Sequence, residues 1–179
     1  NKVRITFLAL LTLVSCSKSK VSSEEYFMQL YTEICMKNIT DPAAIKSAID
    51  SKHIKSLPVE KAKYFLSGQA GEAWLTTHSG KPFVITLTDK GPLCSVHAKE
   101  ANIAALENLF KQTVSVAPEG LAVANDPAKS EVMPMGKIHT LSYSWKKPDA
   151  PKSIYFMLST NESTTANLQA KASVSIASK

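Results

Sequence analysis

The chain has 179 residues, of which 44% are hydrophobic, and it carries a formal net charge of +6. This length suits one domain with a sizeable core. The positive charge comes mostly from scattered lysines, and no arginine follows Arg4. Because nucleic-acid recognition usually uses arginine for bidentate contacts, the composition argues against a nucleic-acid partner. It favours a role in solubility, or weak attraction to anionic lipid or glycan surfaces.

The first fifteen residues are typical of an export signal. Lys2 and Arg4 give a positively charged start, and an almost unbroken apolar run follows over residues 5–14. This run has about half of the roughly twenty residues that a membrane-spanning helix needs. We therefore interpret residues 1–15 as a signal peptide rather than as a transmembrane helix.

The end of this segment resembles the lipobox of bacterial lipoproteins, since Leu13, Val14 and Ser15 lead into Cys16 where the apolar run stops. In a lipobox the cysteine thiol receives a diacylglycerol, and the new amino terminus is then acylated. Two or more acyl chains hold a protein on a membrane stably, so lipidation of Cys16 predicts a membrane anchor. An ordinary secreted protein and a buried core helix are the alternatives.

Residues 17–23 are polar and lack apolar periodicity, so we expect a lipidated cysteine with a flexible tether over residues 16–23. The residue after the cysteine is Ser17 rather than Asp. By resemblance to enterobacterial sorting rules, this serine favours transfer to the outer membrane. We therefore expect a lipid-anchored protein of the bacterial cell envelope, on the outer membrane and facing the periplasm, with a single domain over residues 24–179.

Three helices are predicted at the start of this domain. Residues 22–25 resemble a capping box ahead of a first amphipathic helix over residues 23–37. Asp41 and Pro42 offer an N-cap and a first-turn proline for a second, short helix. A third helix opens at Pro58 and stops near Gly68.

A three-stranded meander is predicted next, from strand-like runs at residues 73–77, 83–88 and 93–98 that are separated by turn residues. Apolar residues at helical spacing then predict a fourth amphipathic helix over residues 103–114, with Asn102 as its cap.

Residues 117–136 contain three prolines and two glycines, which predicts a long surface loop with at most a short strand at residues 121–124. Three further strands are predicted at residues 139–145, 154–159 and 168–176. Together the elements predict an α+β fold. We expect a single antiparallel sheet of about six strands, with the N-terminal helices and the further helix packed on one face.

The three cysteines divide into one predicted lipid attachment site and one pair. With Cys16 acylated, Cys35 and Cys94 remain, and an oxidising compartment would join them in a disulfide. Such a bond would staple the first helix to the third strand of the meander. The alternative is two separate buried thiols that pack as small hydrophobic groups.

Two stretches, residues 65–74 and 91–96, together with Cys35, resemble an uncharacterised family of small neisserial-type lipoproteins of Gram-negative bacteria. The resemblance covers roughly residues 24–115. It implies an export signal and a recurring pair of Cys35 with Cys94. It implies no catalytic residues and no activity.

The sequence contains no recognisable catalytic or cofactor motif. Its four histidines lack the spacing of a zinc site, and the glycine patterns of phosphate loops and nucleophile elbows are missing. We therefore expect no enzyme, no catalytic residues, no metal and no cofactor. The histidines, each interpreted as a surface or strand residue, are His53, His78, His97 and His139.

Aromatic residues are the candidates for binding. Trp74 could anchor an interface, although core packing is the favoured interpretation. Tyr143 and Trp145, with the neighbouring Tyr155, would form a stripe beside lysines that suits a glycan or protein partner if that face is exposed, although the inner face of the sheet is the favoured interpretation. The predicted loop at residues 117–136 is a further candidate.

These observations predict a non-enzymatic envelope lipoprotein that binds another envelope protein, as an adaptor or an inhibitor. The alternative is a lipoprotein that binds cell-wall glycan or a small ligand.

Overall fold

The computed structural model describes residues 20–134 and 136–178. The predicted signal peptide (residues 1–15), the predicted lipidation site Cys16 and residues 17–19 of the predicted tether lie outside this part of the chain. Within it, no helix is both long enough and apolar enough to cross a membrane.

The predicted first helix is present as α1 (Ser23–Leu30), which continues directly into a π-helical stretch, η1 (Tyr31–Met36). The capping box forms: the Glu25 N–H donates to the Ser22 hydroxyl at 3.1 Å, and the Ser22 N–H donates to the Glu25 carboxylate at 2.7 Å. These two bonds satisfy donors that the start of any helix leaves unpaired.

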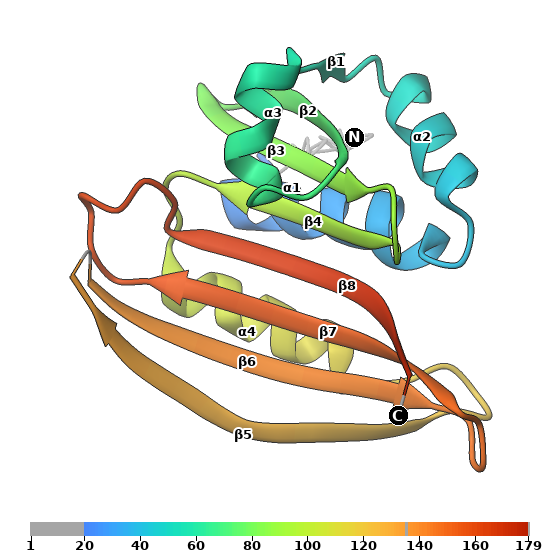
Figure 1. The fold of residues 1–179 in the computed structure, drawn as a ribbon. Helices are drawn as coiled ribbons and strands as arrows, with labels where there is room; N and C mark the ends of the chain where they lie inside the picture. The colour runs from blue at the N-terminus through green and yellow to red at the C-terminus, as the bar shows by residue number, and fades with distance from the viewer. Residues whose placement is uncertain (1–19, 135, 179) are drawn as a thin grey trace, which may run out of the picture.

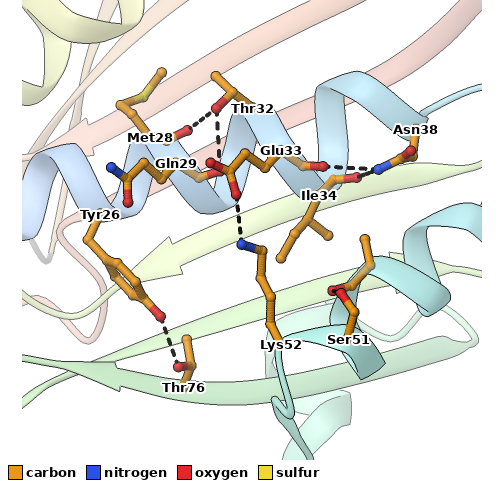
Figure 2. Close-up of polar contacts among 11 residues, drawn as sticks. Tyr26, Met28, Gln29, Thr32, Glu33, Ile34, Asn38, Ser51, Lys52 and Thr76 are labelled. Carbon is orange, nitrogen blue, oxygen red and sulfur yellow. Dashed lines mark hydrogen bonds and ion pairs between the residues drawn. The ribbon is translucent and has the colours of Figure 1, made fainter.

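Polar contacts hold this helix against its neighbours (Figure 2). The Tyr26 hydroxyl lies 3.1 Å from that of Thr76, and the Lys52 ammonium lies 2.7 Å from the Glu33 carboxylate. Beyond η1, the side-chain amide of Asn38 donates to two backbone carbonyls of the preceding turn, each at 3.0 Å. The helix end is thereby satisfied without a glycine cap.

The other three predicted helices are also present. They are α2 (Pro42–Ser51), α3 (Val59–Leu66) and α4 (Ile103–Val114). Asp41 caps α2 through bonds from the N–H groups of Ala43 and Ala44, and Asn102 caps α4 through the N–H of Ala105. Caps of this kind stabilise a helix by about 1 kcal/mol.

The described residues form one antiparallel sheet of eight strands, in the order β1-β2-β3-β4-β8-β7-β6-β5 (Figure 1). The last strand in the sequence therefore lies between β4 and β7 and joins the two halves of the sheet. The strands are β1 (Lys55–Ser56), β2 (Gly71–His78), β3 (Lys81–Thr88), β4 (Leu93–Ala98), β5 (Ala122–Met133), β6 (Gly136–Lys146), β7 (Lys152–Asn161) and β8 (Ala170–Ser178).

The prediction of about six strands was too low, and the main reason is β5. This strand spans twelve residues of the predicted loop, and every one of them is exposed. It therefore has no alternation of apolar and polar residues that a sequence pattern could reveal. Pro127 lies where the register shifts between Asp126 and Lys129, which is a position in an edge strand where a missing N–H is tolerated.

The prediction that all helices pack on one face was also wrong, because α3 covers the opposite face from α1 and α4 (Figure 1). Neighbouring residues of β3 show the two sides. Phe83 contacts the ring of Phe27 on α1, whereas Val84 packs in a cluster with Ala62 and Leu66 of α3. We call these sides of the sheet the α1 face and the α3 face.

The main core lies on the α1 face, where α1, η1, α2 and α4 bury apolar residues against the sheet. Cys35 of η1 and Cys94 of β4 are both fully buried there. They lie at disulfide distance, with their Cα atoms 5.3 Å apart. The predicted staple between the first helix and the third strand of the meander is therefore geometrically in place.

Candidate functional site

A mostly apolar pocket of about 390 Å³ opens on the α3 face. It lies between α3, the strands β2 to β4 and the connection from β7 to β8. The residues that line it are Leu57, Lys61, Tyr64, Phe65, Leu75, Pro82, Val84, His97, Lys99, Asn167 and Leu168.

The sequence of α3 explains why a pocket forms on this face. Ala62 and Leu66 are buried and pack on Ala73 and Val84 of the sheet, so one stripe of the helix is anchored. Phe65 lies beside that stripe and is only partly buried. A helix of eight residues that is fixed along one narrow stripe leaves apolar sheet surface uncovered beside it.

His97 is the most buried of the polar residues that line the pocket, at 2% exposed, and we call its position the base of the pocket. Its Nε2 atom lies 3.1 Å from the Thr86 hydroxyl oxygen on the neighbouring strand. The Phe65 ring packs edge-on against the imidazole, with 5.5 Å between ring centroids. The Nδ1 atom is buried and has no hydrogen-bond partner among the described residues.

The imidazole of His97 is neutral at physiological pH. Burial, followed by the positive charge of Lys171, lowers the pKa of His97 from its ordinary value of 6.5 to about 3. In a neutral imidazole one ring nitrogen donates a hydrogen bond and the other accepts one. Since Thr86 can play either part towards Nε2, the Nδ1 atom is free to serve as donor or as acceptor.

A buried nitrogen without a partner is unusual, because more than nine in ten buried polar groups in proteins are hydrogen-bonded. An unsatisfied group of this kind destabilises the fold by about 1–3 kcal/mol. His97 therefore marks the place in the pocket where a polar group of a ligand, or a water molecule, gains most.

Two lysines line the same pocket as this histidine, and a third neighbours it in the sheet. Lys61 and Lys99 line the pocket, and Lys171 pairs in register with His97 on β8. Burial lowers the pKa of Lys171. None of the three forms an ion pair with a described residue, and the pocket lining includes no carboxylate from the described part of the chain. The pocket therefore favours a negatively charged group at its polar end.

A partly buried polar cluster lies on the α1 face and has a structural role. The Glu107 carboxylate of α4 accepts hydrogen bonds from His139 Nδ1 at 2.7 Å and from the Thr160 hydroxyl at 2.9 Å. The Thr160 hydroxyl donates its hydrogen bond to the carboxylate and not to the imidazole of His139. His139 is therefore not placed to activate this hydroxyl as a nucleophile. The cluster joins α4 to β6 and β7.

The residues described show no metal centre, because no three His, Cys, Asp or Glu side chains gather closely enough to hold an ion. Within the described part of the chain, the imidazole of His97 contacts the Thr86 hydroxyl and that of His139 contacts the Glu107 carboxylate.

The predicted aromatic candidates do not form one surface. Trp74 is 5% exposed and belongs to the core of the α1 face, as the favoured interpretation expected. Tyr143 and Trp145 also point to the α1 face, where they pack on Phe110 and Phe156. The Trp145 Nε1–H donates to the Val114 carbonyl at 2.7 Å, which satisfies the end of α4.

Tyr155 lies on the other side of the sheet. It is paired with Ser144 in the register of β6 and β7, and residues directly opposite each other share a face, whereas successive residues alternate. Tyr155 is therefore separated by the sheet from its predicted neighbours Tyr143 and Trp145. The structure therefore does not bring these three aromatic side chains together on one face of the sheet.

The sequence did not predict this pocket, although His97 was among the histidines considered. Ser95 and His97 alternate with apolar residues on β4, a pattern that indicates one solvent-facing side. Both residues are instead at most 2% exposed. A polar residue buried on the presumed outer side of a strand is the signal of a second packed layer, but only the fold reveals it.

The fold and the pocket define an α+β domain with a ligand-sized cavity beside its shorter helical layer. The chain matches no protein-family model, no curated protein and no solved structure.

Proposed function

We propose that this protein is a non-enzymatic lipoprotein of the bacterial cell envelope that binds a small, mainly apolar molecule in the pocket on the α3 face. The observation that carries this proposal is the unpartnered Nδ1 atom of His97 at the base of an apolar cavity. Of the ligands expected from the sequence, the pocket favours the small molecule.

The size and chemistry of the cavity support this function. Small-molecule sites in proteins are typically pockets of about 300–1,000 Å³, lined by hydrophobic groups with a few polar groups that orient the ligand. The pocket on the α3 face, at about 390 Å³, has this composition, with one buried histidine and lysines at its rim.

The envelope part of the proposal rests on the sequence of residues 1–23 and on the cysteines. The lipobox-like segment ending at Cys16 favours a lipid anchor. The disulfide distance between Cys35 and Cys94 is compatible with an oxidising compartment such as the periplasm. The resemblance to small neisserial-type lipoproteins agrees with both.

Binding can be tested with N-phenyl-1-naphthylamine, a neutral apolar dye that fluoresces when it leaves water. We expect saturable binding of one dye per chain. Leu75→Trp would fill the pocket from a half-buried position on β2 and should weaken binding at least tenfold. Val116→Trp adds the same side chain at a position that is 71% exposed and outside the pocket, so it should bind as the unmodified protein does.

Folding of both variants is checked by circular dichroism and urea unfolding. Binding that is unaffected by Leu75→Trp in a folded protein, or no saturable binding by the unmodified protein, would contradict the proposal.

A protein partner, acting through an adaptor or inhibitor role, is the second candidate. The observation that favours it is β5, a fully exposed strand of twelve residues at the edge of the sheet, where the outer backbone groups can pair with a strand of another chain. A photo-crosslinking residue placed at Val132, which is 85% exposed, should then capture a defined envelope protein. The same residue at Val116 is the control, and equal capture from both positions would rule against strand pairing.

A further inference from the structure

A further cavity adjoins the pocket on the α3 face. A second cavity, also of about 390 Å³, shares Tyr64, Asn167 and Leu168 with it. This second cavity extends towards Met133 and Ile138, at the ends of β5 and β6. The two cavities therefore adjoin at these three shared residues, and we call the pair the groove.

The two ends of this groove differ in chemistry. The first cavity is lined by Lys61, by Lys99 and by His97, whose buried Nδ1 atom has no hydrogen-bond partner among the described residues. The second end is lined mainly by apolar residues, and the described residues contribute no charged side chain there. An occupant that matches both ends has a negatively charged head and a long apolar tail.

We propose that the groove binds a long-chain fatty acid, with its carboxylate at His97 and its acyl chain extended past Leu168 into the second cavity. This inference rests on the proposed function, since it names the chemical class of the ligand for the same pocket.

The hydrogen bonds at the head can all be satisfied in one tautomer of His97. When the Thr86 hydroxyl donates to Nε2, the neutral ring carries its proton on Nδ1 and can donate it to a carboxylate oxygen. A hydrogen bond to a charged acceptor is roughly twice as strong as one between neutral groups. The ammonium groups of Lys61 and Lys99 supply opposite charge at the rim.

The length of the groove leads to a second, independent expectation, which concerns the chain length of the ligand. Burial of each methylene group contributes about 0.8 kcal/mol, which is about a fourfold gain in affinity. A chain that ends inside the first cavity forgoes the gain from the second. Affinity should therefore continue to rise with chain length past the point that one cavity accommodates.

Competition against N-phenyl-1-naphthylamine tests both the carboxylate and the chain length. The competitors are octanoate, tetradecanoate and tetradecan-1-ol, each below its aggregation limit. We expect tetradecanoate to bind at least tenfold more tightly than octanoate, and at least tenfold more tightly than the alcohol of equal length. Lys99→Gln should reduce the preference for the acid over the alcohol. Lys63→Gln is the matched control, because Lys63 is exposed and paired with Glu60 on α3.

The passage between the cavities is tested with Leu168→Trp. This substitution should leave octanoate binding within twofold of the unmodified protein and remove most of the advantage of tetradecanoate. Thr86→Val removes the hydroxyl that orients the His97 ring, and it should lower affinity for the acid more than for the alcohol.

The outcomes separate this inference from the proposed function. If the dye binds and Leu75→Trp blocks it, but acid and alcohol compete equally, the carboxylate assignment is overturned while the pocket remains a ligand site. Equal affinity for octanoate and tetradecanoate would overturn the extended groove in the same way. If the dye does not bind, the proposed function and the inference fail together.

Discussion

Acidification should destabilise the protein through His97. In the folded chain its pKa is about 3, against an ordinary value of 6.5, so protons bind this side chain more tightly when the protein is unfolded. Stability is therefore lost as the pH falls from about 6.5 towards 3, and the loss levels off below that range. Since pH 4 lies about 2.5 pH units below 6.5, at 1.36 kcal/mol per unit, the loss from pH 7 to pH 4 is about 3 kcal/mol.

The contribution of His97 is isolated by comparing the unmodified protein with His97→Gln. The free energy of unfolding in urea is measured at pH 7 and at pH 4 from the fluorescence of the two tryptophans. Carboxylates that titrate in this range are common to both proteins and cancel in the difference. We expect the decrease between the two pH values to be about 3 kcal/mol smaller in His97→Gln.

The control is His53→Asn, because His53 is exposed and asparagine tolerates its positive φ of 53°. This variant should show the same decrease with pH as the unmodified protein. If His97→Gln also lost stability by the same amount as the unmodified protein, His97 would not be held neutral by burial. The description of the pocket base would then be wrong.

Two further predictions concern the core. Replacing both Cys35 and Cys94 with alanine removes a crosslink across 59 residues of sequence, which should lower the free energy of unfolding by about 4 kcal/mol in urea titrations. A reductant should then destabilise the unmodified protein and leave the double variant unchanged, and equal sensitivity of both would refute the bond. Gly71→Ala should lower the free energy of unfolding by about 1–3 kcal/mol in thermal melts, because the added Cβ would collide with the Leu87 carbonyl oxygen and approach Leu66 Cδ2 to 2.9 Å. An unchanged melting temperature would show that the strand can shift to accept it.

Local signals in the sequence predicted most of the secondary structure. Ser22, Asp41 and Asn102 all cap the helices that they were expected to begin. These elements are predictable because a cap or a buried face is set by residues within a few positions of one another. The pairing of Cys35 with Cys94 was predictable for a different reason, since only one other cysteine is present and it falls in the lipobox-like segment.

What could not be predicted depends on contacts between distant segments. β5 has no buried residue, so its pairing with β6 leaves no trace in hydropathy. Thr86 and His97 alternate with apolar residues, as outward-facing side chains do. They are nevertheless buried, because α3 covers the opposite face of the sheet. For Tyr143 and Trp145 the sequence left two interpretations open, an exposed stripe or the favoured inner face of the sheet, because it does not say which side of β6 meets α4.

The position of β8 has a consequence for how the chain reaches its folded state during synthesis. Until residues 170–178 arrive, β4 and β7 each have one unpaired edge, and the strands on either side of the gap are two separate sheets. Cys35 and Cys94, by contrast, both lie within the first 94 residues and can meet before the last strand is paired. Loss of only the last nine described residues would thus remove a central strand rather than an edge strand. The two halves of the sheet would then no longer be hydrogen-bonded to each other.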